Sequence, residues 1–406
     1  MKGFFAGSEV VKKAPARMLP QCGACGLSSK CTTPKMPVRG EGRKGILIVG
    51  EFPSRGDDEN GLQFSDSTGD WLSDKLQALG IDMERDCWLT NSIICTIAQV
   101  SGLDERVDHC RPNLVKTVRD LNPSVVLLLG RGAVQSMIGS FWKDEIGPLG
   151  RWVGWQIPST KPNCWILPTW HPTYVRRENN PALALHFDRH LAALPVLAEK
   201  GRPWDVVPDY SANVEIILDA KEAARILREW IAEGGGTASV DYENTALKPE
   251  YPGAEILCAS VCWNGGRTIS FPWYGEVIEA MREFLWDKRI AKIAANLKHE
   301  NRWTIFTFGH GVVNWLWDTM IGTHMLDNRP GGICSLKFQA YVNLGAEAYD
   351  DHINQFLRGK GEDGRINVAR DEINLNELLL YCGVDSYLEF LLARKQMRQL
   401  KRDFPC

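Results

Sequence analysis

Short, fully apolar runs alternate with amphipathic stretches along the first half of the chain. The apolar runs are typical of strands covered on both faces, and they predict strands at residues 46–49, 87–90, 125–129 and 165–168. The amphipathic stretches predict helices near residues 70–79, 107–121 and 182–197, with another starting at 132. Alternating strands and helices favour a parallel sheet between two helical layers, a three-layer α/β/α unit.

A second α/β unit is expected after residues 199–213, where neither period is visible and Gly and Pro recur. Its predicted elements are strands at 214–217 and 239–243, an antiparallel pair at 256–261 and 267–271, and helices at 220–232 and 375–400. A chain of 406 residues is also too long for one ordinary core. We therefore predict domains at 1–198 and 214–406 with a linker at 199–213.

Composition narrows the class of protein. The chain is 44% hydrophobic and 24% charged, as globular proteins are, and its apolar runs are too short to span a membrane. Residues 1–11 contain no extended apolar segment, so we expect no signal peptide and a cytosolic protein. In that reducing setting twelve cysteines indicate metal sites and buried thiols rather than disulfides. Residues 1–44 carry nine Lys and Arg against two Glu, which suits either a polyanion partner or a solvated tail.

Four cysteines have the spacing of a metal site. Cys22 and Cys25 form a CxxC pair, and Cys95 and Cys110 lie far along the chain with fourteen residues between them. Two close thiolates joined by two from distant loops can close a four-thiolate site. Cys31, shortly after Cys25, is an alternative ligand.

Polar residues follow three of the predicted strands. A glycine-punctuated loop runs from Gly50 to Phe64 after the first strand, Asn91 follows the second, and His171 with Pro172 follows the last. In α/β sheets the carboxyl ends of the strands present the side chains that bind ligands. The sequence therefore predicts a ligand pocket at this edge.

Taken in order, these motifs resemble the family 4 uracil-DNA glycosylases, the iron–sulfur branch of that superfamily, over roughly residues 20–195. The resemblance implies a structural [4Fe–4S] cluster, with Cys22, Cys25, Cys95 and Cys110 as its ligands. It also implies a base-binding pocket for an extruded base, with Glu51, Phe64, Asn91 and His171 in it. Phe64 would stack on the base, Asn91 would read its amide edge, and His171 would donate toward O2 as the glycosidic bond breaks. Asp57 or Asp58 would orient water and stabilise the cationic sugar.

Three positions depart from that family. Phe52 stands where the family has a small residue, Ser54 where it has Gly, and Asp57 where it has Glu. A large ring beside the base is expected to narrow the pocket, change its base preference or block it. The domain is thus a uracil glycosylase, a glycosylase for a modified pyrimidine, or a non-catalytic DNA-binding module.

The second unit carries a different set of acids. Asp241 and Glu243 lie at positions i and i+2, on one face of a strand, which suits two divalent cations about 4 Å apart that activate a water. Further acids are available from Glu300 and Asp385. Tyr381 precedes Asp385 by one helical turn in a YxxxD motif.

These segments resemble the DnaQ-like 3′–5′ exonucleases, close to the proofreading domains of family A DNA polymerases, from about residue 214 onward. The resemblance implies a ribonuclease H-like α/β domain in which Mg²⁺ or Mn²⁺ is bound by Asp241, Glu243, Glu300 and Asp385. It implies that Tyr381 positions the attacking water and that Asn296 helps hold the substrate strand. Glu300 replaces the Asp usual in the family, and Asp318 is predicted to cap the following helix rather than to bind metal.

The leading hypothesis is a two-headed DNA enzyme in repair or replication proofreading, a glycosylase-like domain joined to a two-metal 3′–5′ exonuclease. Its expected substrate is single-stranded DNA or a 3′ end. The alternative is a proofreading subunit for a separate DNA polymerase, in which the glycosylase-like domain only binds DNA. Such a subunit is expected of a bacteriophage or a mobile element.

Overall fold

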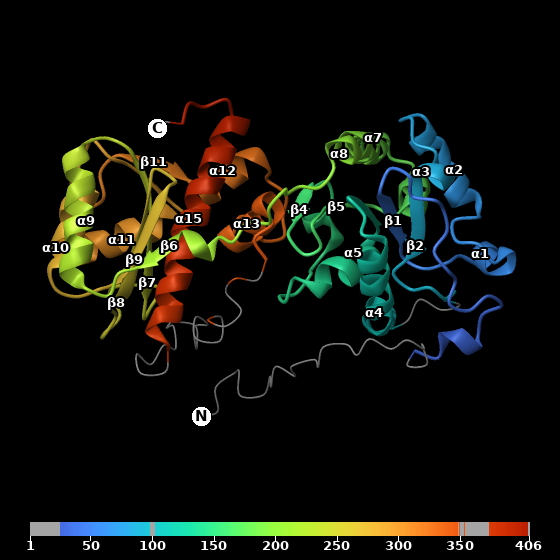
Figure 1. The fold of residues 1–406 in the computed structure, drawn as a ribbon, viewed down its shortest axis with the longest axis horizontal. Helices are drawn as coiled ribbons and strands as arrows, with labels where there is room; N and C mark the ends of the chain where they lie inside the picture. The colour runs from blue at the N-terminus through green and yellow to red at the C-terminus, as the bar shows by residue number, and fades with distance from the viewer. Residues whose placement is uncertain (1–24, 98–101, 348, 350–352, 354–372, 405–406) are drawn as a thin grey trace.

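The computed structural model describes residues 25–97, 102–347, 349, 353 and 373–404. Two α/β units lie side by side, each built on its own sheet, with helix α13 between them (Figure 1). Within the described ranges, none of the helices combines the length and apolar character that crossing a bilayer requires. The fold class predicted from the sequence is thus confirmed as two α/β units.

The first sheet has the strand order β2-β1-β3-β5-β4. Its strands are β1 (Ile46–Gly50), β2 (Cys87–Asn91), β3 (Val125–Leu129), β4 (Ile157–Ser159) and β5 (Cys164–Thr169). All neighbouring pairs are parallel except β4, which pairs with β5 in the antiparallel sense. The four predicted strands are confirmed, whereas the edge strand β4 was not predicted.

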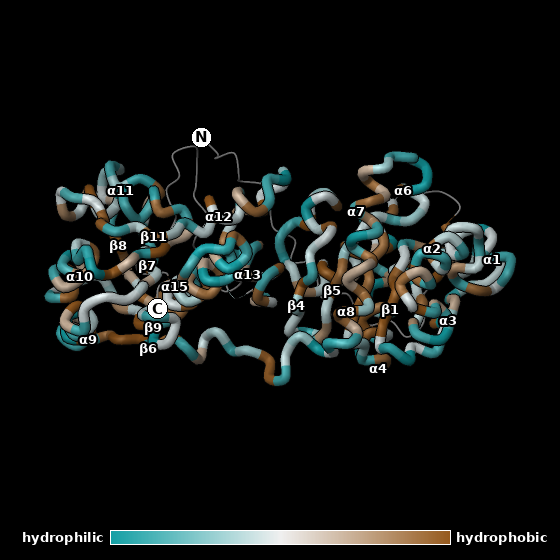
Figure 2. The backbone as a smooth tube through the Cα atoms, turned by 90° about the horizontal axis from the view of Figure 1, so that it is seen from above, coloured by the Kyte–Doolittle hydropathy of each residue, from teal (hydrophilic) through white to brown (hydrophobic). Residues whose placement is uncertain are grey.

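Helices cover both faces of this sheet, which confirms the three-layer arrangement. The helices of the first unit are α1 (Arg55–Asn60), α2 (Ser67–Gln77), α3 (Met83–Asp86), α4 (Leu103–Leu121), α5 (Arg131–Met137), α6 (Pro172–Glu178), α7 (Pro181–Leu191) and α8 (Ala193–Lys200), with short 3-10 turns η1 (Leu27–Ser29), η2 (Ile138–Ser140) and η3 (Leu149–Arg151). Helices α4 and α5 pack on one face, and α2, α7 and α8 on the other. Hydrophobic positions gather along the strands and hydrophilic ones on the outside (Figure 2). The single helix predicted at 182–197 is two helices, α7 and α8.

The second sheet is mixed, with the order β11-β10-β7-β8-β9-β6. Its strands are β6 (Val214–Ile216), β7 (Thr237–Asn244), β8 (Ile256–Trp263), β9 (Arg267–Pro272), β10 (Ala291–Ala294) and β11 (Trp315–Asp318). Strands β7, β8 and β9 are antiparallel, as predicted for the last two, while β6, β10 and β11 pair in parallel.

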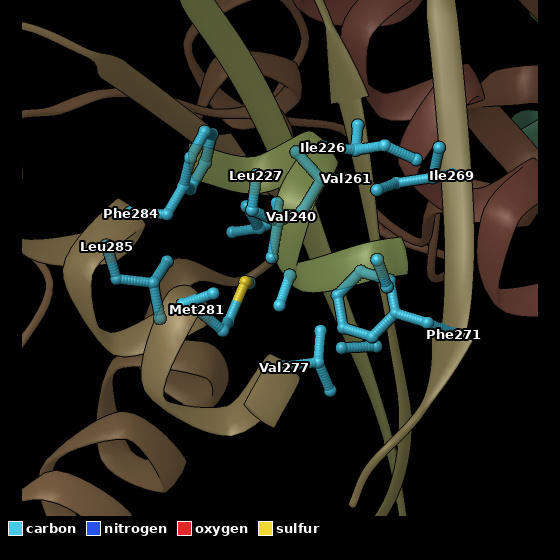
Figure 3. Packing of buried hydrophobic residues seen from close by; sticks show 14 of the residues in the cluster. Ile226, Leu227, Val240, Val261, Ile269, Phe271, Val277, Met281, Phe284 and Leu285 are labelled. Carbon is cyan, nitrogen blue, oxygen red and sulfur yellow. The ribbon is translucent and has the colours of Figure 1, made fainter. Parts of the chain in front are cut away.

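Helices also cover both faces of the second sheet. The helices of the second unit are α9 (Ala220–Glu233), α10 (Glu276–Trp286), α11 (Leu297–Phe308), α12 (Thr319–Leu326) and α15 (Leu375–Gln399), preceded by the turn η4 (Ser211–Asn213), with α13 (Leu336–Leu344) between the two units. Helices α9 and α10 pack on one face, where Ile226 and Phe284 meet the β-branched and aromatic side chains of the sheet (Figure 3). Helix α15 crosses the other face.

Helix α13 joins the two units through a shared core. Phe338 and Tyr341 belong to the same buried cluster as Trp152 of the first unit, and α13 contacts β4. The Arg151 guanidinium lies 4.5 Å from the centroid of the Phe338 ring. On its other side α13 packs on α15. The units are therefore held together by packing as well as by the connecting chain.

Candidate functional site

A cavity of about 230 Å³ opens at the carboxyl ends of β1, β2 and β5. It is lined by Glu51, Phe52, Ser54, Asp57, Phe64, Asp66, Thr68, Gly69, Asn91, His171, Pro172 and Thr173. The four residues predicted to bind a base all line it. Of the two candidate acids, Asp57 lines the cavity and Asp58 does not.

The backbone holds the Phe64 ring in the cavity wall by a strained turn. Phe64 has a φ of 55°, in the left-handed region that is unfavourable for an aromatic residue. A Cβ on Gly69 would lie 2.0 Å from the Phe64 carbonyl oxygen, and one on Gly50 would lie 2.9 Å from Cζ of the ring. Both glycines are thus required for the chain to approach so closely. Such strain costs roughly 1–3 kcal/mol and occurs at sites where a side chain must be held in place.

Asn91 is a buried polar residue in the lining of the cavity, with 4% of its surface exposed. Its Nδ2 donates to Oε1 of Gln63 at 2.8 Å. Gln63 was not singled out from the sequence. The only sequence feature that could have indicated a role for Gln63 is its position directly before Phe64, the residue predicted to stack on the base.

His171 caps helix α6 through its ring. Its Nδ1 accepts a hydrogen bond from the Thr173 N–H at 3.3 Å, so the neutral ring carries its proton on Nε2. Burial lowers the pKa of His171, although the nearby Glu51 and Asp66 carboxylates oppose the shift. At neutral pH the ring is therefore an uncharged Nε2–H donor.

Two of the carboxylates that line the cavity, Glu51 and Asp57, accept hydrogen bonds from the local backbone. Glu51 accepts from the Gly132 N–H at 2.9 Å, which ties the loop after β1 to α5. Asp57 closes a capping box with Ser54 and accepts from the Ser65 N–H at 2.6 Å. Both oxygens of Asp57 are therefore engaged.

Asp58, the next residue of α1, does not line the cavity and anchors the segment that follows Cys31. Its two oxygens accept from the Thr32 and Thr33 N–H groups at 2.9 Å and 2.8 Å. Burial opposes ionisation, but these backbone donors outweigh it and lower the pKa of Asp58. This carboxylate is an anchor between the cysteine segment and the rest of the domain.

Four cysteines of the first unit gather in one cluster with Phe52, which also lines the cavity. Cys95 and Cys110 are buried, and Cys25 and Cys31 are partly buried and pack against them, while Cys22 lies outside the described residues. The Lys35 N–H donates to Sγ of Cys95 at 3.2 Å, and the Asn113 side-chain amide to Sγ of Cys110 at 3.6 Å. Burial raises the pKa of the metal-free Cys95 thiol to about 12, and the neighbouring Cys31 and Cys110 add to the rise. Several sulfurs in an apolar shell with N–H donors fit an iron–sulfur centre.

A second candidate site lies where β7 meets α15. Asp241 and Glu243 of β7 and Asp385 of α15 each place a carboxylate oxygen within 4.8 Å of the others. Among the described residues, this is the one group of His, Cys, Asp and Glu so arranged. Three of the four acids predicted to bind metal thus converge.

Glu300, the fourth, stands next to this group on α11. It is 3% exposed, its Oε2 has no hydrogen-bond partner, and Oδ2 of Asp241 also has none. Burial raises the pKa of Glu300 well above its usual value, and the charge of Asp241 raises it further. Buried carboxylate oxygens without donors are the arrangement that a divalent cation would compensate.

A fifth acid, Glu389, also faces this cluster from α15. One oxygen accepts from the Ala295 N–H at 3.0 Å and the other has no partner. Burial raises the pKa of Glu389 strongly, and Asp241, Glu300 and Asp385 contribute to the rise. Sequence reasoning missed Glu389, although its position one turn after Asp385 repeats the Tyr381–Asp385 spacing.

Two tyrosines border the acids. The Tyr349 hydroxyl donates to Oδ1 of Asp385 at 2.6 Å, and its ring stacks on that of Tyr381 with centroids 6.0 Å apart. Burial, with Asp385 and Glu243 nearby, raises the pKa of Tyr381 well above its usual value, so it stays a neutral hydroxyl. Tyr349 was not identified from the sequence.

Asn296 stands in the turn between β10 and α11 with a φ of 66°. Its N–H and that of Leu297 donate to the Asp318 carboxylate, at 3.2 Å and 3.0 Å. Asp318 also accepts from the Met320 and Ile321 N–H groups, which confirms the predicted helix cap.

Comparison with known proteins gives a distant likeness and a closer one. The catalytic core of RRP6 from Trypanosoma brucei shares 14% identity, and the likeness covers 46% of this chain and 47% of that chain with a TM-score of 0.32. The chain thus spans about half of that structure, and the function of the second unit has to be inferred from its own side chains.

The closer likeness concerns the first unit. A type-4 uracil-DNA glycosylase of Pyrobaculum aerophilum is 28% identical over 184 residues, which cover 43% of this chain and 88% of the relative. One from Archaeoglobus fulgidus is 31% identical over 126 residues, 31% of this chain and 62% of the relative. The model of the uracil DNA glycosylase superfamily matches residues 37–194. These residues therefore form a domain of the uracil DNA glycosylase superfamily.

Proposed function

We propose that this protein is a DNA-processing enzyme with two sites. The pocket of the first unit takes an extruded uracil or modified pyrimidine, and the acid cluster of the second unit hydrolyses DNA from a 3′ end. One observation supports this most strongly: residues far apart in the chain converge in two chemically distinct sets. Phe64, Asn91 and His171 share one cavity, and Asp241, Glu243 and Asp385 lie within 4.8 Å of one another.

In the base pocket each residue type has a physical role. Phe64 offers a held ring for stacking, and Asn91 offers an amide that pairs with the edge of the base. His171, kept neutral by burial, directs an Nε2–H donor at the oxygen on which negative charge develops when the glycosidic bond breaks. This preorganised donor lowers the barrier to bond cleavage.

A [4Fe–4S] cluster fits the cysteine group of the first unit. Cys25, Cys95 and Cys110 would hold it, with either Cys22 or Cys31 as the fourth ligand. When bound it supplies cross-links between segments far apart in the sequence. Asp58 serves the same purpose through its bonds to Thr32 and Thr33.

In the second unit Asp241, Glu243, Asp385 and Glu300 would hold Mg²⁺ or Mn²⁺. Two such ions supply an activated water and stabilise the leaving oxygen of a phosphodiester. The neutral Tyr381 hydroxyl would hold the attacking water, and Asn296 would contact the substrate strand. The 3′–5′ direction of digestion follows from the resemblance to proofreading exonucleases. By the same resemblance, the partner of this protein would be a separate DNA polymerase.

Both sites require unstacked, single-stranded DNA, so joining them raises the local concentration of substrate for each. The shared core around α13 fixes the two units to each other. A role in DNA repair or in replication proofreading is consistent with this pairing.

A second candidate function has specific support. Phe52 lines the base cavity, and both oxygens of Asp57 are engaged by the backbone of the domain. An acid so occupied is poorly placed to orient water. In this version the first unit binds the DNA strand without cleaving it and delivers it to the exonuclease.

A single-stranded oligonucleotide with one uracil and a 5′ label separates the two versions. The protein is incubated with it in EDTA, followed by alkali, and in parallel with Mg²⁺. An alkali-sensitive break at uracil in EDTA, together with a ladder of 3′-shortened products in Mg²⁺, supports both activities. A ladder of 3′-shortened products with Mg²⁺, without that break, supports the DNA-binding version. No product under either condition overturns the proposal.

A further inference from the structure

We infer that Gln63 fixes the orientation of the Asn91 amide and thereby decides which pyrimidine the pocket accepts. The inference rests on the proposed function, because it assumes that Asn91 reads an extruded base. It assigns a positioning role to a residue that does not line the cavity. Gln63 acts only through Asn91.

The orientation of Gln63 is set by its surroundings. Its side chain is buried, with 1% of the residue exposed. Its Nε2 donates to the carbonyl oxygens of Pro37 at 2.6 Å and Met36 at 3.3 Å. Carbonyls only accept, so the amide nitrogen must face them and Oε1 must face the other way. The reverse orientation would set a buried oxygen against two others.

The segment that supplies these carbonyls is itself fixed. The Met36 N–H donates to the Ile94 carbonyl at 2.8 Å. The backbones of Arg39 and Leu89 of β2 exchange two N–H···O hydrogen bonds, at 3.1 Å and 2.8 Å. Arg39 also donates from its guanidinium to the Gln63 carbonyl at 2.6 Å. Gln63 is thus held on both its main chain and its side chain.

This arrangement determines the orientation of Asn91. Because Oε1 of Gln63 can only accept a hydrogen bond, the atom of Asn91 that faces it must be the donor Nδ2. The distance from Nδ2 of Asn91 to Oε1 of Gln63 is 2.8 Å. Oδ1 of Asn91 then lies on the opposite side of the amide and faces Gly50. A Cβ on Gly50 would be 2.2 Å from this Oδ1 and 2.9 Å from Cζ of the Phe64 ring. One N–H of Nδ2 and the acceptor Oδ1 remain for a base, in a fixed spatial order.

That order distinguishes uracil from cytosine. Uracil presents a donor at N3 and an acceptor at O4, whereas cytosine presents an acceptor at N3 and a donor at N4. An amide pairs with one of these patterns in one orientation and with the other when it is flipped. The asparagine alone is compatible with both. The residue behind it makes the choice.

The chain offers a matched control for a test. Gln339 on α13 is also buried, its Nε2 donates to the Ile333 carbonyl, and its Oε1 accepts from the Asn343 amide at 2.9 Å. Replacement of either glutamine by Met keeps the side-chain length and removes one Gln–Asn pair. Only Gln63 lies behind the base cavity.

The experiment measures binding of the full-length protein in EDTA to three single-stranded oligonucleotides. They carry 2′-fluoro-deoxyuridine, 2′-fluoro-deoxycytidine or no pyrimidine, because fluorine at C2′ slows cleavage of the glycosidic bond. We expect the wild type and Gln339→Met to prefer uracil over cytosine. Gln63→Met should lower that preference by about tenfold, the discrimination typical of one paired contact, with unchanged affinity for the control strand. Gln63→Asn, which keeps an amide but is too short to span both partners, is the second variant in case Gln63→Met does not fold.

The outcomes are distinguishable. If the wild type prefers uracil and a folded Gln63 variant keeps that preference, the inference is overturned and the proposed base-binding function stands. If the wild type binds all three oligonucleotides alike, base recognition by this pocket is refuted, and the role of Gln63 with it.

Discussion

Replacing Asp241 by Asn should stabilise the metal-free protein at alkaline pH. Burial raises the pKa of Asp241 from 3.8 to about 6, because the carboxylate is removed from water. The folded state therefore holds this proton more tightly than the unfolded state. The resulting stabilisation is fully present below about pH 4 and is lost as pH rises through 6. At 1.36 kcal/mol per pH unit, the loss is about 3 kcal/mol by pH 8.

Asn has nearly the same shape and never ionises, so Asp241→Asn should escape this loss. In EDTA the advantage of the variant at pH 5 should be about half of that at pH 8, because the loss of 1.36 kcal/mol per pH unit begins near pH 4. At pH 8 the variant should unfold higher, by roughly 5 °C or more if the second unit melts as a domain of about 200 residues. Burial and the charge of Asp241 raise the pKa values of the neighbouring Glu243, Glu300 and Glu389. These acids destabilise both proteins at pH 8, but less in the variant, which lacks the Asp241 charge.

Mg²⁺ should reverse the order. A ligand that binds only the folded state at 100 times its Kd adds about 2.7 kcal/mol, and the wild type retains the full set of carboxylates. Thermal unfolding of both proteins at pH 5 and pH 8, in EDTA and in Mg²⁺, measures all of these effects. A wild type that is more stable than the variant at pH 8 in EDTA, or indifferent to Mg²⁺ at that pH, would refute the reasoning.

Two further substitutions test the supports of each site. Gly69→Ala would place a Cβ 2.0 Å from the Phe64 carbonyl oxygen, so the turn that holds the Phe64 ring must move. We expect at least a tenfold loss of binding to a uracil-containing strand in EDTA, with 3′ digestion in Mg²⁺ unchanged. Gly150→Ala, at a position with open space around it, should change neither activity. Tyr349→Phe removes the hydroxyl that donates a hydrogen bond to Oδ1 of Asp385 and so frees that oxygen for a metal ion. The Mg²⁺ concentration for half-maximal 3′ digestion should therefore fall on the order of tenfold. An unchanged or higher Mg²⁺ concentration would contradict this expectation.

Most strands of the two sheets could be predicted, because they are apolar or alternating stretches bounded by polar turns, whereas β4, β10 and β11 were not predicted. The missed strand β4 is only three residues long, contains Pro158 and forms no run. The apolar positions of helix α13 form too weak a helical pattern to predict that it packs on the first unit. That packing depends on Trp142 and Trp152, which are far from α13 in sequence.

The predicted site residues came from local motifs, whereas the missed ones depend on tertiary contacts. Gln63 and Tyr349 act on residues 28 and 36 positions away, and no local pattern reports such a pairing. Glu389 was accessible, since it continues the i, i+4 series on α15. Asp57 and Asp58 were treated as equivalent in sequence, and only their hydrogen bonds separate them.

The most direct test of two independent sites compares two variants on one substrate, a 5′-labelled single strand with an internal uracil. Asp241→Ala removes a carboxylate of the second site, and His171→Ala removes the donor of the first. Base release is read in EDTA followed by alkali, and 3′ digestion in Mg²⁺. We predict that Asp241→Ala abolishes digestion and keeps base release, and that His171→Ala does the reverse. Loss of both activities in either folded variant would contradict the two-site account.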